Sequence, residues 1–140
     1  MNAIMIQNLK KNYGSFEVSL PRLDLRQGYV TGLVGKNGSG KTTLIRSVLG
    51  VIPKTAGTVQ VLGGDITADP AIREQVGFVS ETPYYIPTLT TGTVHEMVRP
   101  FYPRWDEELY QKMRAEFELP DRKIKELSKG QQKILSFLMA

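Results

Sequence analysis

The residues best suited to chemistry are grouped in one short stretch, GKNGSGKT at positions 35–42. Three glycines stand within six residues there and are followed at once by Lys41, Thr42 and Thr43. Glycine allows left-handed backbone angles that turn successive N–H groups toward one point, and an ammonium group adds a full positive charge. The stretch therefore predicts a binding site for an anion, and phosphate is the best match.

Four positions of this stretch, Gly35, Gly40, Lys41 and Thr42, meet the pattern G-x-x-x-x-G-K-S/T of nucleotide-binding phosphate loops. In such a loop Lys41 reaches the β- and γ-phosphates, and the Thr42 hydroxyl ligates the Mg²⁺ ion that bridges them. A merely flexible glycine-rich loop is the alternative. GTPases need a guanine-reading NKxD-type motif, which this sequence lacks, so adenine is the expected base. The nucleotide-binding residues predicted here are Gly35, Lys36, Asn37, Gly38, Ser39, Gly40, Lys41, Thr42 and Thr43.

The elements that must position the loop are predicted from apolar patterning. Short β-rich pieces fill the first part of the chain, and the run YVTGLV at 29–34 is the strand expected to lead into the loop. KTTLIRSVLG at 41–50 is the helix that follows, and Gly50 is placed to end it. The other expected strands are IMIQNL, FEVSL, GTVQVLG at 57–63 and VGFVS at 76–80.

The last part of the chain is predicted to be helical. Asp106 is the expected cap of a helix that Pro120 ends, and apolar residues recur every four positions within it. We expect a β-rich part at 1–82 and a smaller helical part at 83–140, with the Pro/Thr-rich run 83–93 as the joint. The recurring apolar residues are Leu109, Met113 and Phe117.

Two residues of the helical part, His95 and Trp105, match no motif. Thr93 and Glu96 predict a capping box at the start of a helix that contains His95. We therefore interpret His95 as a bystander to function. Trp105 is interpreted as a packing or subunit-contact residue rather than as part of a ligand site.

Composition restricts the classes of protein that fit. The chain has 140 residues, 41% hydrophobic and 23% charged, which is typical of one soluble globular domain. It has no cysteine, so thiol nucleophiles and zinc–thiolate sites are excluded. No apolar run is long enough to cross a membrane, and no secretory signal is expected at the N-terminus. The net charge of +4 permits an acidic partner, but the positive residues lack the interleaved aromatics of a nucleic-acid platform.

A second motif, LSKGQ at 127–131, precedes the apolar-periodic run QKILSFLMA. By itself it predicts a capping box, in which Ser128 caps a helix and Gln131 reaches back to it. The same geometry directs free N–H groups and a hydroxyl outward from a helix N-terminus, which also suits phosphate. The residues alone leave both interpretations open.

The order and spacing of these motifs resemble those of the ATP-binding subunits of ABC transporters, and within them the exporter-type subgroup. LSKGQ differs by one residue from the family signature LSGGQ, and GKNGSGKT matches Walker A. Tyr13 in LKKNYGS matches the aromatic residue that stacks on adenine, with packing at a strand end as the alternative. The resemblance implies an α/β P-loop NTPase fold of ABC type. The residues matched to the signature are Leu127, Ser128, Lys129, Gly130 and Gln131.

The resemblance also implies cofactors and partners. Two subunits of this family pair head to tail, so that the signature of one covers the ATP on the Walker A loop of the other. We accordingly expect ATP and Mg²⁺ as cofactors, and a second ATP-binding subunit and an integral membrane permease as partners. Nucleic acid is not expected as a partner. The implied location is cytoplasmic, peripheral on the inner face of the cell membrane.

Two residues depart from the family pattern. Glu81 stands where the family has the Q-loop glutamine, and a carboxylate can hold Mg²⁺ but cannot donate a hydrogen bond when ionised. We therefore assign Glu81 to Mg²⁺ binding with Thr42 and to catalysis with Lys41; a surface residue at a strand end is the alternative. Lys129 stands where the family usually has glycine, and either strengthens anion binding or points to solvent.

The Walker B strand, D-loop and switch histidine of the family all follow the signature, and this chain stops at Ala140, ten residues beyond Gly130. We expect a fragment of a longer protein; a naturally shortened, non-hydrolysing form is the alternative. The intact parent is expected to bind and hydrolyse ATP to drive transport, whereas these residues should bind nucleotide and hardly hydrolyse it. Rival functions are a soluble ABC ATPase of translation or DNA repair and a non-hydrolysing nucleotide-binding regulator.

Overall fold

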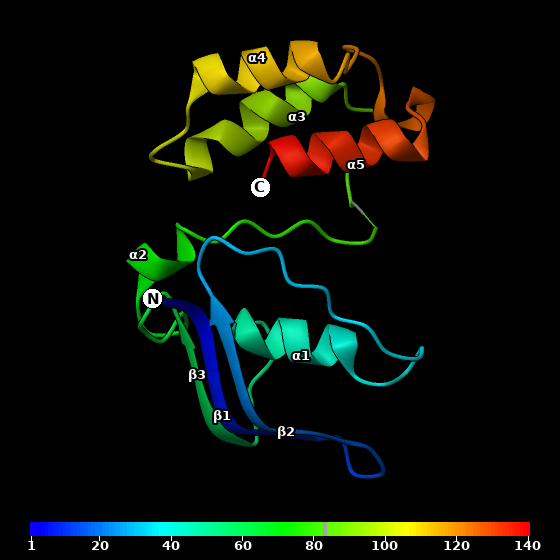
Figure 1. The fold of residues 1–140 in the computed structure, drawn as a ribbon. Helices are drawn as coiled ribbons and strands as arrows, with labels where there is room; N and C mark the ends of the chain where they lie inside the picture. The colour runs from blue at the N-terminus through cyan, green and yellow to red at the C-terminus, as the bar shows by residue number, and fades with distance from the viewer. Residues whose placement is uncertain (83) are drawn as a thin grey trace. The chain divides into compact units, whose positions relative to one another are not determined.

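The computed structural model describes residues 1–82 and 84–140, and its chain divides into two compact units, Met1–Gln75 and Val76–Ala140. The first unit combines a three-stranded sheet with the helix that follows the glycine loop, and the second unit is helical (Figure 1). The division predicted from the sequence, with nucleotide binding in residues 1–82 and the signature in residues 83–140, remains a prediction. No helix in the described part of the chain is long and apolar enough to cross a membrane.

The sheet of the first unit consists of β1 (Asn2–Asn12), β2 (Glu17–Arg26) and β3 (Ala56–Val61). Its order is β2-β1-β3, and both pairs are antiparallel. The segments IMIQNL, FEVSL and GTVQVLG are therefore confirmed as strand-forming. Asn8 has a φ of 50°, and the register of β1 on β3 shifts at this point. This bulge turns Ile6 and Leu9 toward the same side, where both are fully buried.

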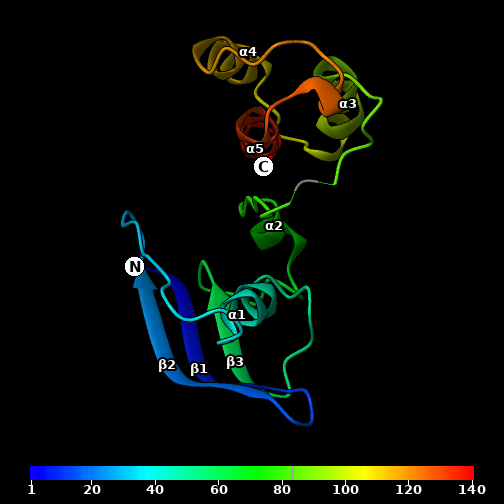
Figure 2. The same ribbon diagram turned by 90° about the vertical axis from the view of Figure 1, so that its right-hand side faces the viewer.

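Helix α1 (Lys41–Val48) follows the glycine loop as predicted and lies along one face of the sheet (Figure 2). It ends in a Schellman motif: the Gly50 amide donates to the Ser47 carbonyl at 3.2 Å, and the Val51 amide donates to the Arg46 carbonyl at 2.9 Å. Gly50 has the required positive φ of 67°. Its predicted role in ending the helix is confirmed. The remaining short helix of this unit is α2 (Pro70–Arg73), capped by Asp69.

Two predicted strands do not form. The segments 29–34 and 76–80 carry no regular secondary structure, and Val30 and Val34 are almost fully exposed to solvent. A strand needs a neighbour that satisfies its backbone N–H and C=O groups. Within residues 1–82 and 84–140, no strand pairs with either segment. The prediction that these two segments are strands is wrong, because strand formation depends on pairing with residues that are distant in the sequence.

The second unit is held by one buried cluster, which joins its helices and its loops. The bounds are α3 (Thr91–Val98), η1 (Arg99–Phe101), α4 (Glu107–Glu116), η2 (Ile124–Glu126) and α5 (Lys129–Leu138). The buried members of the cluster are Val94, Tyr110, Leu119, Ile124, Leu127, Leu135 and Met139. The predicted joint at 83–93 begins at Pro83, which lies outside the described residues, and ends inside α3.

The predicted Asp106 cap of helix α4 is confirmed, and the apolar repeat of Leu109, Met113 and Phe117 is not its most buried side. The Asp106 carboxylate accepts a hydrogen bond from the Leu109 amide at 2.8 Å. Leu109 is 50% exposed and Phe117 is 41% exposed, whereas Tyr110 is only 4% exposed. One residue along a helix is a rotation of about 100°, so Tyr110 points to a different side from the predicted stripe. The core therefore meets the helix on the Tyr110 side.

The capping box predicted from Thr93 and Glu96 is wrong. The cap of helix α3 lies three residues earlier, at Thr90, whose hydroxyl accepts a hydrogen bond from the Thr93 amide at 3.1 Å. The start is set by a distant residue, because Asp121 accepts hydrogen bonds from the Gly92 amide at 2.9 Å and the buried Thr91 hydroxyl at 3.1 Å. Local sequence does not show this contact.

Candidate functional site

The glycine loop has the conformation that its composition predicts. Gly38 and Gly40 have φ values of 81° and 94°, and the Ser39 amide donates to the Lys36 carbonyl at 3.2 Å. These are left-handed angles, which side chains other than glycine adopt at a cost. The loop is exposed along most of its length, so a ligand from solvent can reach its backbone.

Lys41 lies across this loop instead of extending into solvent. Its Nζ donates hydrogen bonds to the carbonyl oxygens of Gly35 at 2.6 Å and Lys36 at 2.8 Å. The ammonium group therefore has a fixed place beside the loop and one donor left for a further acceptor, since an ammonium has three. A negatively charged group in the loop would meet a cation that is already positioned.

The start of α1 adds a second source of positive potential. Gly40 is the N-cap and supplies no side-chain acceptor, so the first amides of the helix have no cap among the described residues. The N-terminus of a helix carries a partial positive charge and free N–H groups. Thr42 is exposed and Thr43 is partly buried at this point. The loop, the helix start and Lys41 together form a site that suits phosphate.

The loop is packed against strand β2. A Cβ atom on Gly40 would lie 2.6 Å from Val18 Cγ2 and 3.5 Å from Phe16 Cζ. On Gly35 a Cβ atom would lie 2.7 Å from the Ser39 hydroxyl. Gly40 is therefore favoured both by close approach and by its backbone angle, whereas at Gly35 the only close atom is a side-chain hydroxyl that can turn away. Phe16 and Val18 border the loop. Neither belongs to a motif, and their only signal in the sequence is their alternation in FEVSL.

Tyr13 lies in the turn between β1 and β2, in the same unit as the loop. Its side chain is 50% exposed, and the Lys11 ammonium lies 5.2 Å from its ring centroid. The Phe16 ring stacks on it at 6.5 Å with an interplanar angle of 20°. Phe16 also approaches Gly40. The Phe16 side chain therefore lies between Tyr13 and the glycine loop.

The signature residues have a clear structural role in α5. The Ser128 hydroxyl accepts a hydrogen bond from the Gln131 amide at 3.1 Å, and the Gln131 side chain accepts one from the Ser128 amide at 3.0 Å. The predicted capping box is confirmed. Leu127 is buried in the core of the second unit, whereas Lys129 and Gly130 are exposed. The cap uses Ser128 as an acceptor, so its hydroxyl proton is free to donate elsewhere.

Glu81 is exposed and belongs to the second unit, while Lys41 and Thr42 belong to the first. A carboxylate and a threonine hydroxyl are both hard oxygen ligands of the kind that Mg²⁺ prefers. No cluster of three or more acidic or histidine residues that could hold a metal occurs in residues 1–82 and 84–140. The assignment of Thr42 and Glu81 to Mg²⁺ binding stays a prediction.

His95 and Trp105 take part in a packed polar network of the second unit. His95 is 5% exposed, stacks on Tyr110 at 4.2 Å and lies 3.0 Å from the Glu107 carboxylate through Nε2. Trp105 Nε1 donates to the same carboxylate at 3.0 Å. Hydrogen bonds from Gln111 first, and then from Trp105 and His95, lower the pKa of Glu107. These contacts join α3 to α4, which agrees with the structural interpretation of both residues.

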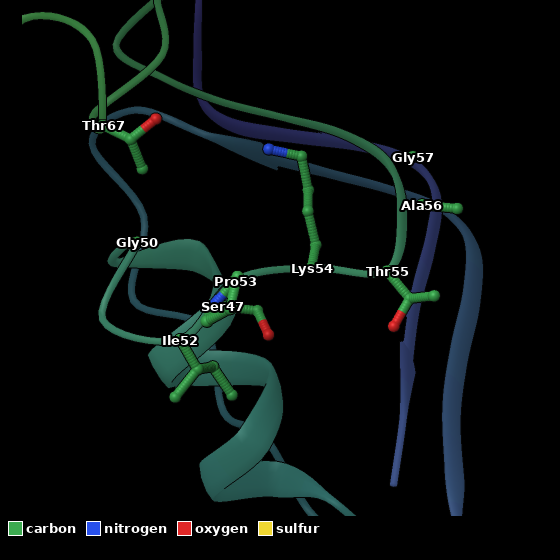
Figure 3. A pocket seen from close by; sticks show the side chains of 9 residues that line it. All are labelled: Ser47, Gly50, Ile52, Pro53, Lys54, Thr55, Ala56, Gly57 and Thr67. Carbon is green, nitrogen blue, oxygen red and sulfur yellow. The ribbon is translucent and has the colours of Figure 1, made fainter. Parts of the chain in front are cut away.

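A cavity of about 550 Å³ lies at the other end of α1, away from the glycine loop (Figure 3). It is lined by Ser47, Gly50, Ile52, Pro53, Lys54, Thr55, Ala56, Gly57 and Thr67. None of the predicted site residues is among them. Figure 3 shows the Lys54 side chain extending away from the Ser47 hydroxyl, so the polar groups do not converge.

Comparisons with known proteins identify the family of the chain. The model of the ABC transporter family matches residues 19–140. Over 120 residues the chain is 30% identical to the ABC transporter ATP-binding protein YtrB of Bacillus subtilis (strain 168), covering 84% of this chain and 41% of that protein. A further relative is the sulfate/thiosulfate import ATP-binding protein CysA of Mycolicibacterium paratuberculosis, 40% identical over 79 residues, which are 55% of this chain and 22% of that protein.

Solved structures show the same fold. An ATP-binding subunit of an ABC transporter matches with a TM-score of 0.80 at 23% identity, over 99% of this chain and 61% of that one. The ADP conformation of an ATP-binding cassette of an ABC transporter matches with a TM-score of 0.75 at 27% identity, over 99% of this chain and 64% of that one.

The fold and the loop thus define an α/β P-loop domain of the ABC ATPase type. The chain belongs to the ABC transporter family. It spans about two fifths of the length of YtrB, given the 41% coverage of that relative.

Proposed function

We propose that this chain is the nucleotide-binding part of the ATP-binding subunit of an ABC transporter. In this proposal the intact parent binds and hydrolyses ATP to drive a substrate across the membrane. The observation that carries the proposal is the Lys41 ammonium, held by the Gly35 and Lys36 carbonyls beside the uncapped start of α1. Family membership supports it, because the relatives are ATP-binding proteins by name.

Different residues of the loop would bind different parts of the triphosphate. Backbone amides from Gly35 to Thr43 cradle the phosphate oxygens, and the Lys41 ammonium offsets the charge of the β- and γ-phosphates. The Thr42 hydroxyl, with Glu81, would hold Mg²⁺, which supplies further charge neutralisation on the phosphates. Tyr13 stacks on adenine, for which its half-exposed ring in the same unit is suited.

Partners follow from the same proposal. A second ATP-binding subunit would place its own loop against the signature of this chain, so that Ser128 and the Gly130 amide contact the partner's γ-phosphate. The free proton of the capping hydroxyl and the exposure of Lys129 and Gly130 support this role. An integral membrane permease is the second proposed partner, and a peripheral cytoplasmic location follows from it. By themselves these residues are proposed to bind ATP and hardly hydrolyse it.

The test is equilibrium binding of Mg²⁺–ATP to the Lys41→Ala variant, measured by calorimetry. Hydrogen bonds to charged groups contribute about 1.5–3 kcal/mol, so we expect the Kd to rise roughly 10- to 100-fold. The matched control is Lys54→Ala, which removes the same charge from the same unit at the far end of α1. It should leave the Kd within about twofold, as expected for a distant screened charge. Equal Kd values for wild type and Lys41→Ala would exclude the loop as the ATP site.

A further inference from the structure

Phe16 lies close to both Tyr13 and Gly40 of the proposed nucleotide site. It stacks on Tyr13, with 6.5 Å between ring centroids and an interplanar angle of 20°. Its Cζ atom also lies 3.5 Å from the position that a Cβ atom on Gly40 would take, so the ring borders the phosphate loop. Phe16 is 40% exposed, and no motif singled it out.

The turn that carries Tyr13 is tightly defined. The Tyr13 amide donates to the Phe16 carbonyl at 2.8 Å, and the Asn12 side chain accepts a hydrogen bond from the Gly14 amide at 2.6 Å. Gly14 has a φ of 82°, so the chain reverses direction within four residues. This geometry fixes the backbone of Tyr13, but it leaves the rotation of its side chain to whatever packs beside the ring.

The pairing of β1 with β2 shows which face of the sheet carries Lys11, a neighbour of the Tyr13 ring. Val18 pairs directly with Lys11 across the two strands, and paired residues project from the same face of a sheet. Val18 approaches Gly40, so Lys11 lies on the same face as the loop. The Lys11 ammonium is 5.2 Å from the Tyr13 ring centroid. The two neighbours of the Tyr13 ring, Phe16 and Lys11, thus lie on the side of the sheet that faces the loop.

We propose that Phe16 is a positioning residue, which orients the Tyr13 ring for adenine while resting on Gly40 of the phosphate loop. This proposal rests on the proposed binding of ATP. It adds Phe16 as a residue that affects the affinity contributed by adenine stacking. An oriented ring loses less side-chain freedom when a base stacks on it, so the stacking free energy is realised more fully. Phe16 itself touches neither the phosphates nor the reacting atoms.

The experiment compares two ligands, Mg²⁺–ATP and inorganic tripolyphosphate with Mg²⁺, on the full 140-residue chain. For Phe16→Leu we expect the Kd for ATP to rise roughly 3- to 10-fold, the range that an aromatic pair contributes. The Kd for tripolyphosphate should stay within about twofold, because it has no base. Phe16→Tyr keeps the ring and should restore wild-type affinity for ATP. Tyr29→Leu removes an exposed aromatic residue of the same unit and is the matched control.

A double-mutant cycle with Tyr13→Leu separates positioning from general support. In the Tyr13→Leu background, Phe16→Leu should add no further loss of ATP affinity, because there is no ring left to orient. Additive losses, or an equal loss with tripolyphosphate, would overturn the inference and leave ATP binding by the loop intact. A wild-type chain that binds neither ligand would overturn the proposed function as well. Equal unfolding midpoints of the variants confirm that all are folded.

Discussion

At the scale of single residues, the phosphate loop combines one fixed cation with backbone that only glycine adopts easily. Lys41 is held by the carbonyls of Gly35 and Lys36, and Gly38 and Gly40 have positive φ values. The two glycines differ in their surroundings. A Cβ atom on Gly38 would meet nothing within 4 Å, whereas one on Gly40 would meet Val18. Backbone strain and packing can therefore be measured separately in one loop.

Gly38→Ala should lower the free energy of unfolding by about 1–2 kcal/mol, the cost of a left-handed angle for alanine. Gly40→Ala should cost about 1–3 kcal/mol more, because the new methyl group would lie 2.6 Å from the Val18 methyl and a β-branched side chain cannot turn away easily. Denaturant unfolding of the first unit provides the measurement.

The control for this pair is Val18→Ala, which removes the opposing methyl groups. In that background Gly40→Ala should cost about as much as Gly38→Ala, since only the backbone term of about 1–2 kcal/mol remains. A Gly40→Ala penalty that does not change with residue 18 would show that the contact with β2 is not what requires glycine there.

At the scale of elements, the helices of the second unit are begun by side chains that act as acceptors. Ser128 caps α5, Asp106 caps α4 and Thr90 caps α3. The start of α3 has an additional acceptor, Asp121, which lies 29 residues after Gly92 in the sequence and accepts a hydrogen bond from its amide at 2.9 Å. This hydrogen bond links the loop after α4 to the start of α3.

Asp121→Asn should lower the stability of the second unit at neutral pH. The hydrogen bond from the Gly92 amide, followed by those from the Thr91 and Thr90 hydroxyls, lowers the pKa of the Asp121 carboxyl from 3.8. A carboxyl whose folded pKa is depressed contributes its stability above its unfolded pKa and loses it as pH falls through the folded value. Because the group is largely exposed, we expect a loss below about 1 kcal/mol at pH 7.

The measurement is denaturant unfolding of wild type and Asp121→Asn from pH 7 downward. The difference between them should be constant above the unfolded value of 3.8 and should disappear as the wild-type carboxyl becomes protonated below it. Glu126→Gln, an exposed carboxylate of the same unit, serves as the comparison. A difference that persists unchanged at the lowest pH would assign the effect to packing instead of charge.

At the scale of the whole molecule, charge is divided unevenly between the two units. Residues 1–75 carry nine Lys or Arg and five Asp or Glu, whereas residues 76–140 carry nine of each. The net charge of +4 thus belongs to the unit that contains the phosphate loop. An exposed anion site in a positive unit gains long-range attraction that salt screens.

The Kd for Mg²⁺–ATP should therefore rise several-fold between about 0.05 M and 0.5 M NaCl, over which the screening length falls from above 10 Å to a few ångströms. Adenosine, which has no phosphate, should bind with a Kd that salt changes little. Calorimetric titrations of both ligands in the same salt series provide the test. A salt dependence shared by adenosine would point to a change in the protein and not to phosphate attraction.

Several features of this protein follow directly from residue type and local spacing. These are the turn of the glycine loop, the helix that follows it, the end of that helix at Gly50, the Asp106 cap and the capping box of Ser128 and Gln131. Each depends on contacts within a few residues, so residue type and spacing are sufficient to predict it.

Other features depend on contacts between residues that are distant in the sequence, and they are visible only in the folded protein. The segment 29–34 has β-prone residues but no strand partner among residues 1–82 and 84–140, the buried face of α4 is at Tyr110, and α3 begins where Asp121 holds it. The contact of Phe16 with Gly40 likewise joins residues 24 positions apart. Hydrogen-bond pairing and burial require a partner in space, and sequence spacing does not say where that partner lies.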